Sequence, residues 1–188
     1  MITMDHAKEK PEILKAELVA ESRLFKVESL HLKFSNGEER VYERMRGGGR
    51  GAVMVVPMLD DQTLLLVREY AAGTHSYELG FPKGLIDPGE DIFEAGNREL
   101  MEEAGFGARE LIPLKQVSLA PGYFSSRMDI LLARELYPEQ REGDEPEPLE
   151  VIPWPLHDID TLLARSDFTE SRSISALLLA QKWLKEES

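Results

Sequence analysis

The sequence predicts a mixed α/β protein of the α+β type, in which helices pack on a mixed β-sheet. The first observation is the order of patterns along the chain: strands, one helix, further strands and two closing helices. The second is that residues 52–58 and 63–67 are nearly continuous apolar runs, which are typical of strands buried on both faces. With 188 residues and a 42% hydrophobic composition, the chain is long enough for one sizeable core.

An antiparallel hairpin is expected near the N-terminus. Between residues 23 and 45, two alternating stretches flank Ser35-Asn36-Gly37, and Asn-Gly between alternating runs is a strong hairpin signal. We therefore assign residues 1–46 to an N-terminal extension with a hairpin and residues 47–188 to the main domain. The glycine-rich residues 47–51 favour a linker, and a phosphate-binding loop is the weaker alternative because no helix pattern follows it directly.

The main domain is expected to place one helix among its strands. Helical spacing runs from Asp91 to Ala104 and ends before Gly105. Residues 111–119 and 128–133 predict two more strands, and the acidic, proline-rich residues 139–150 predict an exposed loop. Two helices then close the chain, with apolar positions at Leu156, Ile159, Leu162 and Leu163 in the first and at Ile174, Leu177, Leu178 and Leu184 in the second.

The composition excludes several function classes. A formal net charge of −13 argues against a nucleic-acid partner, because such proteins gain affinity from clustered basic residues. No cysteine is present, so disulfides, thiolate metal sites and a cysteine nucleophile are excluded. Without an apolar signal sequence or a membrane-length apolar run, we expect a cytoplasmic protein with no membrane partner. A small phosphorylated ligand can still bind where divalent cations reverse the local charge.

Three glutamates share one face of the predicted central helix. Glu99, Glu102 and Glu103 stand at positions i, i+3 and i+4, beside an apolar stripe that packs inward. Like charges at these spacings repel each other, so the cluster needs a compensating partner. A hard divalent cation such as Mg²⁺ prefers carboxylate oxygens and is the natural partner, whereas a solvated acidic face is the plainer alternative.

The surrounding residues decide between these alternatives. Residues 84–106 satisfy the pattern G-x5-E-x7-R-E-U-x-E-E-x-G-U, where U is a bulky apolar residue, with Gly84, Glu90, Arg98 and Gly105 at fixed positions. A chance match in such a chain is on the order of one in a million. The sequence therefore resembles the Nudix hydrolases. That resemblance implies a three-layer α/β/α sandwich around a mixed sheet and hydrolysis of a nucleoside diphosphate linked to some group X.

The resemblance also implies roles for the signature residues. Glu99 and Glu103 would bind Mg²⁺, with Mn²⁺ as the alternative, and Glu102 would contribute directly or through water. The backbone carbonyl of Lys83 would complete the shell, and Glu90 would anchor the loop by hydrogen bonding. Arg98, four residues before Glu102, would orient its carboxylate.

Residues outside the signature indicate the substrate. Pro121, sixteen residues after Gly105, resembles the marker of the ADP-ribose pyrophosphatase branch, although Pro-Gly would also make a plain turn. Ala71 stands where many members of that branch carry a second arginine, which favours a site tolerant of several X groups. Residues 77–80 and 123–126 resemble bacterial hydrolases of ADP compounds. The implied substrates are ADP-ribose, NADH and diadenosine polyphosphates, with release of AMP, and the implied assembly is a homodimer built through the N-terminal strands.

The catalytic base and the substrate contacts are less specific. Residues 142–145 stand where this branch supplies its base, so Glu145 is the first candidate and Glu142 the second, although an exposed acidic loop explains them nearly as well. Glu78 is a further metal ligand, a salt-bridge partner or a substrate contact. The remaining candidates are arginines suited to phosphate or ribose and an aromatic ring suited to adenine, at Arg44, Arg46, Arg68 and Tyr123.

Two other functions compete with this interpretation. A Nudix hydrolase of nucleoside triphosphates would share the signature but not Pro121 or the N-terminal hairpin. A non-catalytic sensor of ADP derivatives is a different class of protein. Such sensors usually lose signature glutamates, and all of them are present here.

Overall fold

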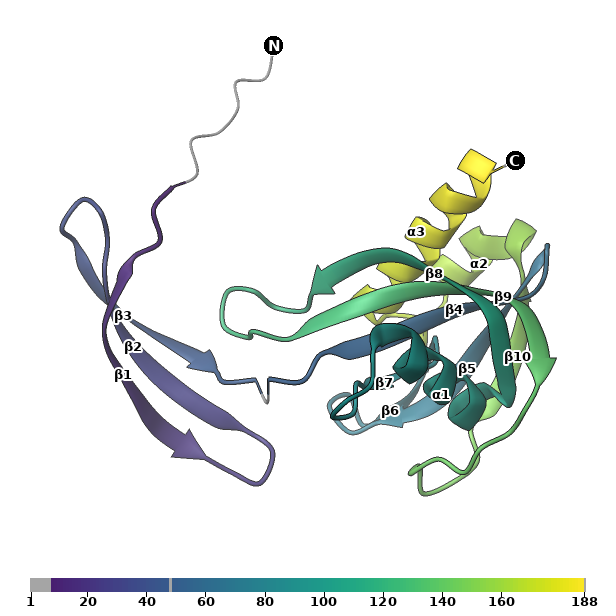
Figure 1. The fold of residues 1–188 in the computed structure, drawn as a ribbon, viewed down its shortest axis with the longest axis horizontal. Coiled ribbons are helices and arrows are strands. Elements are labelled where there is room, and N and C mark those ends of the chain that lie inside the picture. Colours follow the sequence, from purple (N-terminus) through teal and green to yellow (C-terminus); the bar gives the residue numbers. More distant parts are fainter. Residues whose placement is uncertain (1–7, 48, 188) are drawn as a thin grey trace, which may run out of the picture. The chain divides into compact units, whose positions relative to one another are not determined.

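The computed structural model describes residues 8–47 and 49–187, and it divides into two compact units (Figure 1). The first unit holds the chain up to Gly49 together with Ala120–Ser126. The second holds Arg50–Leu119 and the chain from Arg127 onward. The joining of Ala120–Ser126 to the first unit was not anticipated from the sequence, because the two segments are far apart along the chain.

The N-terminal unit is a three-stranded antiparallel sheet in the order β1-β2-β3. Its strands are β1 (Glu12–Glu21), β2 (Lys26–Lys33) and β3 (Glu39–Met45). The predicted hairpin is confirmed: Gly37 has a φ of 85°, and the Asn36 side chain accepts a hydrogen bond from the Glu38 N–H at 3.1 Å. The first strand was not predicted, because its apolar residues lack regular alternation and every residue in it is exposed.

The second unit is built on a seven-stranded sheet in the order β10-β5-β4-β9-β8, in which β6 also pairs with β5 and β7 with β4. The pair β4–β9 is parallel and the others are antiparallel, so the predicted mixed sheet is confirmed. Its strands are β4 (Ala52–Asp60), β5 (Thr63–Ala71), β6 (Ser76–Gly80), β7 (Lys83–Leu85), β8 (Phe106–Ser118), β9 (Arg127–Pro138) and β10 (Glu150–Pro155).

Helices cover both faces of this sheet. They are α1 (Ile92–Ala104), the 3-10 turn η1 (Leu156–Asp158), α2 (Ile159–Leu163) and α3 (Ser171–Glu187). Val53 and Val55 of β4 belong to the core clusters formed with α1, whereas Met54 and Val56 belong to the cluster formed with α2 and α3. Because alternate residues of a strand face opposite sides, the sheet lies between two helical layers, as predicted. No helix in the described residues is both long and apolar enough to cross a membrane.

Local sequence explains where α1 begins and ends. Asp91 caps its N-terminus, accepting hydrogen bonds from the Phe93 and Glu94 N–H groups, and Glu94 bonds back to the Asp91 N–H. Gly105 ends it in the left-handed conformation at φ 75°. Gly96 lets the helix approach the sheet closely, since a Cβ there would lie 2.7 Å from Leu131 Cδ1. The glutamates on the other side of α1 are thereby held in position.

Candidate active site

A cavity of 600 Å³ lies in the second unit beside α1. It is lined by Arg50, Glu69, Lys83, Gly84, Leu85, Asp87, Arg98, Glu99, Glu102, Glu103, Glu142, Gly143, Asp144 and Glu145. Eight of these side chains are acidic and three are basic, so the cavity carries an excess of negative charge. A phosphate group would be repelled here unless cations entered with it.

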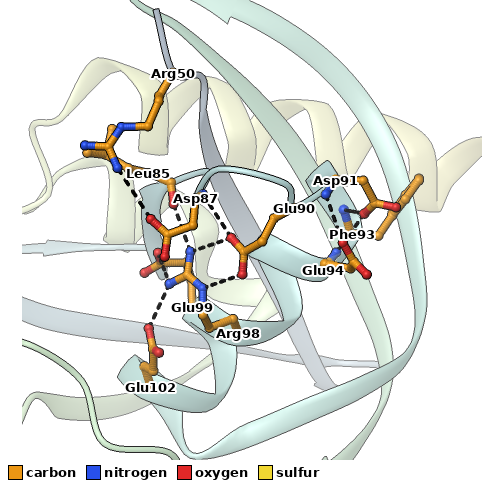
Figure 2. Close-up of polar contacts among 10 residues, drawn as sticks. All are labelled: Arg50, Leu85, Asp87, Glu90, Asp91, Phe93, Glu94, Arg98, Glu99 and Glu102. Carbon is orange, nitrogen blue, oxygen red and sulfur yellow. Dashed lines mark hydrogen bonds and ion pairs between the residues drawn. The ribbon is translucent and has the colours of Figure 1, made fainter. Parts of the chain in front are cut away.

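Arg98 is the centre of a hydrogen-bond network at this cavity (Figure 2). Its guanidinium donates to Glu90 at 2.8 Å, to Glu99 at 2.7 Å and to Glu102 at 3.0 Å. It also donates to the Leu85 carbonyl at 2.9 Å, which ties α1 to the end of β7. The pKa of Arg98 is raised by these partners, with Glu90 as the largest contributor. The arginine therefore orients the signature carboxylates.

Glu90 anchors the loop before α1. It accepts a hydrogen bond from the Asp87 N–H at 3.0 Å in addition to those from Arg98. The Arg98 guanidinium holds the pKa of Glu90 below its usual value, against a smaller opposing effect of burial. Its contacts are thus within the loop and with Arg98, as in the anchoring role implied by the signature.

Strand β7 approaches the glutamates through its backbone. A Cβ at Gly84 would overlap the Glu99 carboxylate, so only glycine leaves room for that side chain. The Lys83 N–H donates to Glu103 at 3.2 Å. The backbone of β7 and the carboxylates of α1 therefore meet at one place.

Glu99 and Glu103 are carboxylates in an unfavourable environment. They are 7% and 5% exposed, respectively. Burial raises the pKa of Glu103 to about 9, although the nearby Lys83 ammonium opposes the shift. Burial also raises the pKa of Glu99, which Arg98 opposes and the Glu102 and Glu145 carboxylates reinforce. Two carboxylates that are buried with so little positive charge around them are stabilised by taking up a proton or by binding a cation.

The donor set fits a hard divalent cation. It consists of carboxylate and carbonyl oxygens, which Mg²⁺ and Mn²⁺ prefer, and it leaves space for water and phosphate. Among the described residues, however, no three acidic or histidine side chains are already arranged around one cation position. Glu99 and Glu102 instead turn toward Arg98, which donates a hydrogen bond to each of them (Figure 2).

The predicted base candidates lie in the same cavity as the signature glutamates. Glu145 is half-buried and Glu142 is exposed. A side chain at Gly143 would collide with the Glu145 carboxylate and lie 3.6 Å from Glu102 Cβ, which places this loop directly beside α1. The fold thus brings together two acidic segments that are about forty residues apart.

Arg68 and Glu78 lie elsewhere in the second unit. Arg68 donates to Glu150 at 2.9 Å and to Asp167 at 2.6 Å, and it does not line the cavity described above. Glu78 accepts from the Ser76 hydroxyl at 2.7 Å and lines a neighbouring cavity of 450 Å³. The structure therefore separates these two candidates from the glutamates of α1.

The remaining candidates lie in the N-terminal unit. Arg44 donates to Glu28 at 2.9 Å, and Arg46 lies 3.6 Å from the same carboxylate with 62% of its side chain exposed. Tyr123 is 59% exposed, and its carbonyl accepts from the Met45 N–H at 2.7 Å. Pro121 lies in the turn closed by the hydrogen bond from the Phe124 N–H to the Ala120 carbonyl at 2.8 Å.

Three cavity residues were missed from the sequence. Arg50 belongs to the glycine-rich stretch that was interpreted as a linker, and its guanidinium lies 3.5 Å from the carboxylate of Asp87, which also lines the cavity. Glu69 follows a predicted strand and pairs with the Lys83 ammonium at 2.5 Å. Asp87 lies inside the signature at a variable position. The only signal in the sequence was that each of these charged residues lies within or next to a recognised motif.

Comparison with known proteins agrees with this geometry. The NUDIX domain model matches residues 49–178, and the model of the NudE-type Nudix hydrolase N-terminal domain matches residues 11–44. The ADP compounds hydrolase NudE of Escherichia coli (strain K12) is 60% identical over 182 residues, which cover 97% of each chain. The ADP-ribose pyrophosphatase of Bacillus subtilis (strain 168) is 29% identical over 72% of this chain and 74% of that protein.

A solved structure shows the same fold. The crystal structure of an ADP compounds hydrolase matches with a TM-score of 0.92 and 59% identity, covering 98% of this chain and 99% of that chain. The domain model spans well over half of the sequence, and the signature glutamates lie together on α1 beside β7. The resemblance seen in the sequence is thereby confirmed, and the chain belongs to the Nudix hydrolase family.

Proposed function

We propose that this protein hydrolyses the diphosphate linkage of ADP-containing compounds, with Mg²⁺ as its metal, and releases AMP. The observation that carries the proposal is the acidic cavity in which Glu99 and Glu103 are buried against the backbone of Lys83 and Gly84. The names of the similar proteins, an ADP compounds hydrolase and an ADP-ribose pyrophosphatase, support the substrate class.

The metal would be held by Glu99 and Glu103, with Glu102 contributing directly or through water and the Lys83 carbonyl completing the set. Bound there, a divalent cation neutralises phosphate charge and lowers the pKa of an attacking water. Glu99 and Glu102 would first have to turn from Arg98, which continues to hold the loop through Glu90 and the Leu85 carbonyl. We propose Mg²⁺ because oxygen donors and phosphates are its usual ligands, and Mn²⁺, which prefers the same donors, is the alternative.

Glu145 is our first candidate for the base that accepts the proton of the attacking water. It lines the same cavity as the metal-binding glutamates and is close enough to Glu99 to contribute to the rise in its pKa, which burial dominates. Glu142 is the second candidate, because it lines the cavity but is more exposed. A base must lie within hydrogen-bond reach of its proton, and a half-buried side chain is held more firmly there.

The substrate contacts follow from which side chains are available. The exposed Arg46 and Tyr123 are proposed to contact phosphate and adenine. Arg44 pairs with Glu28 but its side chain is still 43% exposed, so it is proposed as a further phosphate contact. Arg68 is committed to Glu150 and Asp167, so we now propose that it supports the fold around Asp167. Glu78 is proposed to contact the part of the substrate beyond the diphosphate.

The N-terminal sheet is proposed to form a homodimer, because it exposes many large apolar side chains in a small unit. The acidic charge and the absence of cysteine support a cytoplasmic enzyme of small molecules, with no nucleic-acid or membrane partner. Light scattering should give twice the monomer mass of 21.3 kDa. A monomer mass would refute the dimer.

A substrate panel tests the proposed activity. ADP-ribose, NADH, diadenosine triphosphate and a set of nucleoside triphosphates are incubated with Mg²⁺ or Mn²⁺, and products are identified by chromatography. AMP from the first three, and its loss on addition of a chelator, is the expected result. Release of inorganic pyrophosphate from the triphosphates alone would favour the other type of Nudix hydrolase. Binding without product would favour a sensor.

A further inference from the structure

A second cavity of 450 Å³ adjoins the catalytic one. It lies between the ends of β5 and β6 and the first turn of α3. Glu69 and Lys83 line both cavities, and their side chains pair at 2.5 Å. The two cavities therefore meet at this ion pair.

The second cavity contains a buried hydroxyl with no partner. Ser173 is 1% exposed, and its Oγ is the one buried side-chain polar atom in the described residues that lacks a hydrogen bond. The backbone at Gly80 makes room for this hydroxyl, since a Cβ there would lie only 3.1 Å from it. A buried hydroxyl without a partner is unfavourable, and a hydrogen bond from a ligand hydroxyl would remove that penalty.

The rest of the wall suits a neutral, hydroxyl-rich group. Glu78 accepts a hydrogen bond from the Thr169 hydroxyl at 3.2 Å, and Thr74 also lines the cavity, so its wall carries both carboxylate and hydroxyl oxygens. Arg172 donates to Glu170 at 2.6 Å. Lys83 pairs with Glu69. Among the described residues, every cation that lines the cavity therefore has a carboxylate partner. Another phosphate group would meet no free cation.

Apolar side chains complete the cavity. Val67 and Leu79, which line it, are buried, and Tyr70, which also lines it, is 43% exposed. The carbon face of a sugar ring packs on such apolar surfaces, and its hydroxyls form hydrogen bonds with the polar side of the cavity. Small-molecule sites usually combine apolar and polar walls in this way. The volume also lies within the range of such sites.

We infer that this second cavity binds the group X of the substrate, and that it selects a ring bearing several hydroxyls, such as ribose. The inference rests on the proposed function, because it assigns the half of the substrate beyond the diphosphate. Ser173 would bond one ring hydroxyl at the floor, and Glu78 another at the wall. The preference for a group X would then come from α3 and β6, not from the Nudix signature on α1.

Two serines of the same helix make a matched test. Ser173→Ala removes the unpartnered hydroxyl, whereas Ser175→Ala removes an exposed one that donates to the Ser171 carbonyl at 2.8 Å. Each variant is assayed with ADP-ribose and with the methyl ester of ADP, which has the diphosphate but no ring in X. We expect Ser173→Ala to raise KM about 3- to 10-fold for ADP-ribose alone, the effect of one lost hydrogen bond. Ser175→Ala should leave both KM values unchanged.

The outcomes separate the two proposals. If the wild type hydrolyses both compounds and Ser173→Ala affects both equally or neither, the assignment of the cavity is wrong while the proposed function stands. If the wild type hydrolyses neither compound, the proposed function fails. The cavity is then tested by calorimetric binding of ribose 5-phosphate with Mg²⁺, which Ser173→Ala should weaken by the same factor. Unchanged binding would overturn the inference.

A stability measurement checks the premise. Because its hydroxyl has no partner in the fold, Ser173→Ala should leave the thermal unfolding temperature equal or higher. A clear decrease would mean that the hydroxyl is satisfied inside the protein, which contradicts the inference. Glu78→Gln keeps the size of the side chain and changes its charge, and it should raise KM for ADP-ribose more than for the methyl ester.

Discussion

The two units of the molecule differ in how much apolar surface they bury. Of the 29 buried hydrophobic residues in the described part of the chain, Leu30 alone lies in the N-terminal unit. All ten residues of β1 are exposed, and large apolar side chains such as Ile13 and Leu18 lie about half in solvent. The Nudix unit instead buries β4 almost completely between α1 and α3.

This difference indicates that the two units have different roles. Apolar burial is the main stabilising contribution to folding, so the Nudix unit holds its own core and can position charged groups in a cavity against it. The three-stranded sheet lacks such a core and presents apolar surface, which is typical of an interaction surface. Changes in the Nudix unit should therefore alter chemistry, and changes in the N-terminal sheet should alter assembly.

The sharpest test of the expectation that changes in the Nudix unit alter chemistry is the variant Glu103→Gln. Turnover of ADP-ribose with Mg²⁺ should fall by about 10²- to 10⁴-fold, because a metal ion contributes several kcal/mol to such reactions. The thermal unfolding temperature should stay equal or rise, since a buried carboxylate is removed, and the mass in solution should not change. Glu94→Gln, on the same helix but in the N-terminal cap, is the control and should keep activity. Near wild-type turnover in Glu103→Gln would exclude a metal role for Glu103.

The complementary test is Leu18→Asp in the N-terminal sheet. Leu18 lies opposite Glu28, and Tyr42 lies opposite Leu30, so these apolar side chains share one face of the sheet. A charge there should raise the dissociation constant of the proposed homodimer roughly 30-fold or more, as for the loss of an interface residue worth about 2 kcal/mol. Light scattering across a dilution series measures it.

Val41→Asp is the matched control, because Val41 lies on the opposite face of the same sheet and is 67% exposed. It should leave the dissociation constant nearly unchanged. Equal effects of the two variants would mean that the interface does not use the face that carries Leu18.

Gly84→Ala tests whether the backbone of β7 determines the position of the Glu99 carboxylate. The added Cβ would displace the Glu99 carboxylate, which is the flexible end of its side chain. We therefore expect stability within about 0.5 kcal/mol of wild type but a roughly 10-fold lower kcat. Gly73→Ala, where a Cβ meets nothing within 4 Å, should change neither quantity. An equal loss of stability and activity in Gly84→Ala would indicate general damage to the fold.

The last test concerns stability alone, at a polar contact of the Nudix unit outside the catalytic cavity. Hydrogen bonds from Arg165 and Arg68 hold the pKa of Asp167 below its usual value, although burial opposes them. A carboxylate with a lowered pKa stabilises the fold above its unfolded pKa of about 4, and this stabilisation is lost as the pH falls below that value. Asp167→Asn should lower the unfolding temperature by roughly 3–10 °C at pH 7.

The same variant should lose less of its stability than the wild type between pH 5 and pH 2, as followed by circular dichroism. Asp61→Asn changes a side chain that is 97% exposed and should behave as wild type throughout. Parallel pH profiles for wild type and Asp167→Asn would show that the ion pairs contribute nothing measurable.

The accuracy of the sequence predictions depended on the range of the interactions involved. The hairpin at Asn36-Gly37 and the helix from Asp91 to Ala104 were predicted because turn and cap preferences act over a few residues. The mixed sheet was predicted from the order of strands and helices along the chain. Strand β1 was missed, because nothing in its own residues distinguishes an exposed strand from a loop. The first closing helix is also shorter than its apolar spacing suggested, with Leu156 in a 3-10 turn.

The sequence by itself determined the family and the placement of Glu99, Glu102 and Glu103 on one face of a helix. Their spacing is a local property of 3.6 residues per turn, and it holds wherever the helix lies. Tertiary structure alone decided which distant groups meet those glutamates. Arg50 and Glu145 reach the same cavity only because β4 and the loop before β10 lie beside α1, and such long-range packing has no local pattern in the sequence.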